Sequence, residues 1–73
     1  MLKKSVKIAL EAILNDLRMN LENNYKDLAH DALKRLYAAL DQYIKEGVMK
    51  EKDYLRYKQV ADTYAQSMVN YHH

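Results

Sequence analysis

The sequence contains no cysteine, no proline, no tryptophan and no phenylalanine, and only one glycine among its 73 residues. Without cysteine the chain forms no disulfide and offers no thiolate to a metal. The additional stabilisation that a small domain often needs must then come from helix packing or self-association. Proline and glycine form many of the turns in β-rich folds, and their scarcity here favours long helices with short connections. These absences predict an all-helical domain.

Long apolar runs are missing as well. The chain opens with lysines, as signal peptides do, but Glu11 interrupts the apolar run that ends at Leu10. This pattern provides neither a secretory segment nor a membrane span. We therefore expect a cytoplasmic protein and do not expect a membrane as its partner.

Charge of one sign is not concentrated anywhere. The net charge is +2, and basic and acidic groups alternate along the whole chain. A nucleic-acid-binding surface gathers its lysines and arginines in one patch, whereas interleaved charges are typical of a solvated surface. We therefore do not expect nucleic acid as the main partner.

The stretch from Tyr25 to Gly47 is the most informative part of the sequence. Drawn as a helix at about 100° per residue, it has an apolar half and a polar half. An apolar half is wider than the stripe of about 100° that one neighbouring helix covers. This helix should therefore lie between two others. The apolar half consists of Leu28, Ala29, Ala32, Leu33, Leu36, Ala39, Leu40, Tyr43 and Ile44.

Turn signals divide the chain on both sides of this helix. Asn24 is expected to cap its start, and Gly47 is expected to follow its end with a positive φ. The predicted fold class is all-α, a small antiparallel three-helix bundle that forms a single domain over residues 1–73. The alternative is one continuous helix through Asn23-Asn24, in a hairpin that dimerises into a four-helix bundle. The three predicted helices span about residues 4–22, 25–46 and 50–70.

The first helix carries a second, smaller apolar set opposite its core face. Ile8, Ala12 and Met19 follow one another at helical spacing, with Asn15 between the last two. Scattered apolar residues are common on protein surfaces. An aligned set that the core cannot reach is instead a candidate for self-association or for binding a partner helix.

The third helix is rich in tyrosine. Tyr57, Tyr64 and Tyr71 recur every seven residues, beside a second row formed by Tyr54, Ala61 and Met68. Tyrosine places its ring at the edge of a core and its hydroxyl in water, and it is also enriched at binding hot spots. Tyr57, Tyr64 and Tyr71 are thus core-edge residues or an interaction surface.

No catalytic, cofactor-binding or metal-binding pattern is present in the sequence. Asp27, His30 and Asp31 have ligand spacing on one helical turn, but one turn supplies too few ligands and no second cluster faces them. We expect no enzyme, no cofactor and no metal. The predicted function is a non-catalytic protein-interaction module, a regulator or adaptor that forms a weak homodimer or binds a larger protein. The alternative is a nucleic-acid-binding accessory protein.

Overall fold

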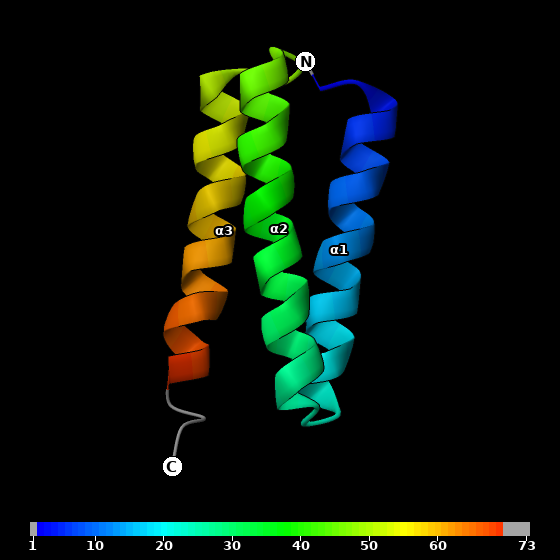
Figure 1. The fold of residues 1–73 in the computed structure, drawn as a ribbon, viewed down its shortest axis with the longest axis vertical. Coiled ribbons are helices and arrows are strands. Elements are labelled where there is room, and N and C mark those ends of the chain that lie inside the picture. The colour runs from blue at the N-terminus through cyan, green and yellow to red at the C-terminus, as the bar shows by residue number, and fades with distance from the viewer. Residues whose placement is uncertain (1, 70–73) are drawn as a thin grey trace.

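A computed structural model describes residues 2–69 of the chain as three helices. These are α1 (Lys4–Glu22), α2 (Lys26–Glu46) and α3 (Glu51–Val69). The chain runs down α1, up α2 and down α3 in Figure 1, within a body of 39 × 18 × 15 Å. The predicted all-α, antiparallel three-helix bundle is confirmed. The predicted helix bounds agree to within one residue, except that residue 70 lies outside the described residues.

Helix α2 occupies the middle of the bundle, as its broad apolar face predicts. Both α1 and α3 pack directly against it, and within residues 2–69 the backbones of α1 and α3 do not approach each other closely. One cluster of buried side chains joins all three helices, with Leu36 and Leu40 of α2 almost completely excluded from solvent. The other members are Val6, Leu10, Leu14, Leu17, Ala29, Ala32, Leu33, Met49, Tyr57, Ala61 and Met68.

Two residues of the predicted apolar face of α2, Ile44 and Leu28, neither belong to the core nor pack against it; Ile44 is half-buried. Leu28 is 55% exposed, so its assignment to the core was wrong. It sits at the border of the apolar half, where side chains point past the neighbouring helices rather than between them. In the same bundle, Ala61 and Met68 are almost completely buried, so this row of α3 faces the core.

The first turn breaks the chain between α1 and α2, so the alternative of one continuous helix is wrong. Asn24 has φ 61°, in the left-handed region. Its amide donates to the Leu21 carbonyl, and the Tyr25 amide donates to the Asn20 carbonyl. This pair of bonds is the Schellman arrangement that satisfies the last carbonyls of a helix. Asn24 therefore ends α1, and the prediction that it caps the start of α2 was wrong.

The second turn uses the same geometry at the only glycine. Gly47 has φ 75°, its amide donates to the Ile44 carbonyl at 3.2 Å, and the Val48 amide donates to the Tyr43 carbonyl at 3.2 Å. The prediction of a positive φ just past the end of α2 is confirmed. Val48 and Tyr43 are both half-buried against the core, so the apolar residue that follows Gly47 is used in packing.

We expect Gly47→Ala to lower the free energy of unfolding by about 1 kcal/mol. A Cβ at this position would meet no atom within 4 Å, so the whole effect comes from holding an L-residue at positive φ. Thermal or denaturant unfolding of the two proteins measures it. Gly47→Asn is the matched control. Because asparagine tolerates this φ better than alanine, this variant should lose less free energy of unfolding than Gly47→Ala. A neutral result for Gly47→Ala would contradict the turn geometry.

Candidate functional site

The outer face of α1 is the most exposed apolar surface that the sequence singled out. Ile8 is 60% exposed and Met19 is 52% exposed, and Ala12 lies exposed between them. The helix buries Leu10 and Leu17 completely on its opposite side. Folding of the bundle therefore leaves this face unused. Hereafter the "outer face" means Ile8, Ala12, Asn15 and Met19.

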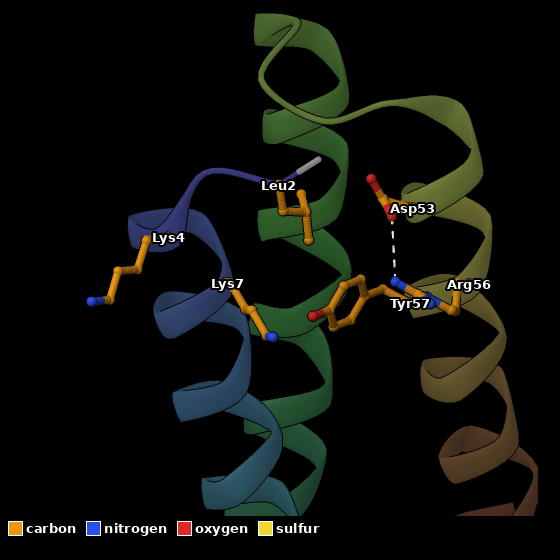
Figure 2. Close-up of a pocket in the computed structure, with 6 residues that line it drawn as sticks. All are labelled: Leu2, Lys4, Lys7, Asp53, Arg56 and Tyr57. Carbon is orange, nitrogen blue, oxygen red and sulfur yellow. Dashed lines mark hydrogen bonds and ion pairs between the residues drawn. The ribbon is translucent and has the colours of Figure 1, made fainter.

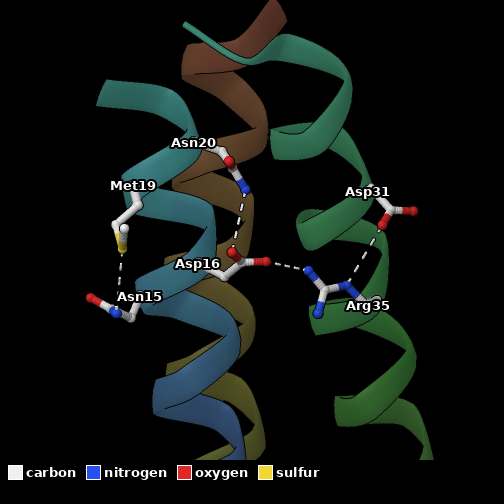
Figure 3. Close-up of polar contacts among 6 residues, drawn as sticks. All are labelled: Asn15, Asp16, Met19, Asn20, Asp31 and Arg35. Carbon is white, nitrogen blue, oxygen red and sulfur yellow. Dashed lines mark hydrogen bonds and ion pairs between the residues drawn. The ribbon is translucent and has the colours of Figure 1, made fainter. Parts of the chain in front are cut away.

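Polar contacts on α1 show which of its sides faces α2 and which carries the outer face. Arg35 of α2 forms an ion pair with Asp16 of α1, and its Nε lies 3.7 Å from an Asp31 carboxylate oxygen (Figure 3). Asn15 and Met19 lie on the other side of α1, where the Asn15 amide contacts the Met19 sulfur at 3.8 Å. Exposed ion pairs contribute about 0–1 kcal/mol each. The outer face lies on the side of α1 that points away from Arg35 of α2.

The tyrosines predicted as core-edge residues or an interaction surface on α3 differ in their burial. Tyr57 is only 9% exposed and belongs to the core, which removes it from a surface formed by the folded chain. Its hydroxyl donates to Glu11 Oε2 at 3.3 Å, a contact between α3 and α1. Burial, followed by the negative charge of Glu11, raises the pKa of Tyr57, which stays protonated as a donor. Tyr64 is half-buried against the core, and Tyr71 lies outside the described residues.

A second tyrosine connects α2 with α3. The Tyr37 hydroxyl donates a hydrogen bond to an Asp62 carboxylate oxygen. Burial, the hydrogen bond and the charge of Asp62 together raise the pKa of Tyr37 to about 12. The phenol therefore remains a hydrogen-bond donor throughout the physiological range. This contact and the Tyr57–Glu11 contact tie α3 to both of its neighbours.

A shallow groove lies between the N-terminal ends of α1 and α3 (Figure 2). Its volume is about 510 Å³, and Arg56 in its wall is paired with Asp53 at 3.4 Å. Lys4 points away from α3 in this view, whereas the Tyr57 ring points from α3 toward α1. The lining offers two lysines, the Arg56–Asp53 pair, one leucine and one phenol, and it contains no nucleophile beside a base. The lining residues are Leu2, Lys4, Lys7, Asp53, Arg56 and Tyr57.

The described residues contain no group of three or more histidine, cysteine, aspartate or glutamate side chains that could hold a metal ion. Asp27, His30 and Asp31 occupy the first turns of α2, where Asp27 and Asp31 are exposed. Within residues 2–69, no helix has the combination of length and apolar content needed to cross a membrane.

Three large apolar side chains that are more than half exposed were not among the predicted interaction residues. Tyr25 follows the end of α1, Leu28 lies on α2, and Leu55 lies on α3, and each is more than half exposed. Leu55 could have been found in the sequence, since it falls off the heptad rows of α3. Tyr25 could not, because its exposure depends on the Asn24 turn.

No protein-family model, curated protein or solved structure matches this chain. Its function must therefore be inferred from the geometry and chemistry of the described residues.

Proposed function

We propose that this protein is a non-catalytic protein-interaction module that self-associates through the outer face of α1. The observation that carries the proposal is the exposure of Ile8 and Met19, at 60% and 52%, on the side of α1 opposite its buried residues. Removing such side chains from water is favourable at about 25 cal/mol per Å². The proposed role is that of a small cytoplasmic regulator or adaptor.

The size of this surface determines the expected strength. Ile8 and Met19 are eleven residues apart, which is about 16 Å along a helix at about 1.5 Å per residue. A contact of this length buries less than the roughly 800 Å² per partner of a standard stable interface. We therefore expect a weak homodimer with a dissociation constant on the order of micromolar.

The test is the double variant Ile8→Glu with Met19→Lys. The added charges cancel, so the net charge remains +2. Helix content and melting temperature should hold nearly constant, because neither side chain is in the core. The apparent mass from light scattering at high protein concentration should fall toward the 8.6 kDa of one chain.

Leu55→Glu with Val60→Lys is the matched control. Both residues are exposed apolar side chains of α3, and the added charges again cancel. This variant should keep the apparent mass of the wild type. A wild-type chain that is monomeric at high concentration would refute self-association. Unfolding of the Ile8→Glu, Met19→Lys variant would instead show that the outer face is part of the core.

The runner-up is a nucleic-acid-binding accessory protein, and the observation in its favour is the basic lining of the α1–α3 groove. Lys4, Lys7 and Arg56 are close enough to line one groove, although Asp53 neutralises Arg56. Salt separates the two functions. Binding through phosphate contacts weakens steeply as salt rises, whereas association through apolar side chains holds or tightens.

A further inference from the structure

Helix α1 carries its charges in the reverse of the favourable order. Lys4 and Lys7 occupy its first turn, which contains no acidic residue, and the helix ends at Glu22 with no basic residue in its last turn. The N-terminus of a helix is electropositive and the C-terminus electronegative. Both ends of α1 therefore carry charges that its own dipole repels. The side chains of Lys4, Lys7 and Glu22 are all exposed, so they are accessible to charges on another molecule.

The outer face is complementary to itself in the antiparallel sense. Two copies of α1 placed antiparallel about a twofold axis between Ile13 and Leu14 bring Ile8 of one copy opposite Met19 of the other. The same placement brings Ala12 opposite Asn15. Every residue of the outer face thus meets another member of the same face. In a parallel arrangement Asn15 would meet Asn15, and the lysine-rich ends would lie side by side.

The charges agree with the antiparallel arrangement. Lys4 and Glu22 are 18 residues apart, which is five turns of a helix at about 3.6 residues per turn, so they flank the outer face on the same side. In an antiparallel pair related by a twofold axis, residues that flank the interface on one side of the first helix lie beside residues on that same side of the second helix. Glu22 of one copy would then lie beside Lys4 at the electropositive end of the other copy. Each copy supplies the charge that the other copy's helix end lacks.

We infer that two copies of this protein associate through an antiparallel pairing of α1, with Ile8 against Met19 and Lys4 against Glu22 of the second copy. This inference rests on the proposed function and specifies its geometry. Ala12 near the axis allows the helices to approach closely, and it leaves room for the Asn15 amides of the two copies. An isologous contact of this kind closes after two copies and does not propagate into a filament.

Cysteine cross-linking tests the pairing without interference, because the chain contains no cysteine. Ile8→Cys and Met19→Cys are prepared separately, mixed and oxidised mildly. A disulfide needs Cα atoms within about 7 Å. The mixture should therefore give the mixed disulfide, identified by its intact mass, while each variant alone stays uncross-linked. In an antiparallel pair of the Ile8→Cys variant, the two introduced thiols lie about 16 Å apart along the helix.

A mixture of Leu55→Cys with Ile8→Cys measures the background from random collision. Cross-linking of Ile8→Cys with itself would overturn the antiparallel pairing and leave self-association intact. If the wild type is a dimer but the Ile8→Cys and Met19→Cys mixture does not exceed the Leu55→Cys background, the pairing is also overturned, because another face then forms the contact. A wild-type monomer would refute the proposed function as well.

Charge reversal gives a second readout. Lys4→Glu places like charges together across the pair, and we expect the dissociation constant of the dimer to rise between about two- and thirtyfold. The change favours the α1 dipole, so weaker association would not come from a less stable helix. Adding Glu22→Lys to Lys4→Glu restores opposite charges and should return the dissociation constant to near the wild-type value. Failure of the double variant to recover would overturn the Lys4–Glu22 contact.

Discussion

Leu36→Ala should lower the free energy of unfolding by about 2–5 kcal/mol. Leu36 is 0% exposed, lies in the middle of α2 and belongs to the cluster that joins all three helices. Removal of the side chain beyond Cβ leaves a cavity. Because α1 and α3 are already packed against α2, they cannot move inward to fill it. A bundle of this size has a stability of only about 3–5 kcal/mol, so a large part of the protein would be unfolded at room temperature.

Leu28→Ala is the control, with the same chemical change on the same helix. Leu28 is 55% exposed, and we expect its loss to change the free energy of unfolding by less than about 0.5 kcal/mol. Denaturant titration followed by circular dichroism measures both variants. A loss below about 1 kcal/mol for Leu36→Ala, or an equal loss for the two variants, would contradict the position of the core.

The contrast between these two leucines shows what the sequence determines. Period and spacing identify the centre of an apolar face well, and Leu36 lies near that centre. At the border of the face, burial depends on how far the neighbouring helix extends sideways, which one helix alone does not reveal. Leu28 lies at that border. The pattern therefore predicted the helices, their order and most of the core, and it failed at the border of one face.

The two turns differ in predictability for a related reason. Gly47 is the only glycine, and its use at positive φ follows from its lack of a side chain. Asn24 had two roles open to it, since asparagine both caps helix starts and tolerates the left-handed region. The hydrogen bonds of Asn24 and Tyr25 to the end of α1 decide between them. That choice depends on the path of the chain, which local sequence does not encode.

The candidate site was predictable where exposure alone defines it. Ile8, Ala12 and Met19 lie opposite a strongly apolar face of α1, and within the described part of the chain no helix covers them. Tyrosine is harder to assign, because its ring favours burial and its hydroxyl favours water. Tyr57 lies in the core because it fills the space between α3 and α1, which only the tertiary structure reveals.

Tyr57 of α3 is buried and donates to Glu11 of α1, and its ring should contribute much more to stability than its hydroxyl. Among residues 2–69, the backbones of these helices do not approach each other closely. The buried ring of Tyr57 helps to fill the space between them. Tyr57→Ala should lower the free energy of unfolding by about 3–5 kcal/mol, as for other buried aromatic rings. Tyr57→Phe keeps the ring and removes only the 3.3 Å hydrogen bond to Glu11. Tyr57→Phe should lower the free energy of unfolding by less than about 1.5 kcal/mol, because Glu11 is exposed enough to be solvated without its partner.

The comparison of these two variants in denaturant separates packing from hydrogen bonding. Tyr64→Ala serves as the control on the same helix. Because Tyr64 is only half-buried, this variant should lower the free energy of unfolding by less than Tyr57→Ala does. Tyr57→Phe should also remove one high-pKa phenol from the alkaline absorbance titration, since burial and the charge of Glu11 raise the pKa of Tyr57. If Tyr57→Phe proves as destabilising as Tyr57→Ala, the hydroxyl contact with Glu11 holds α3 to α1, and the ring does not.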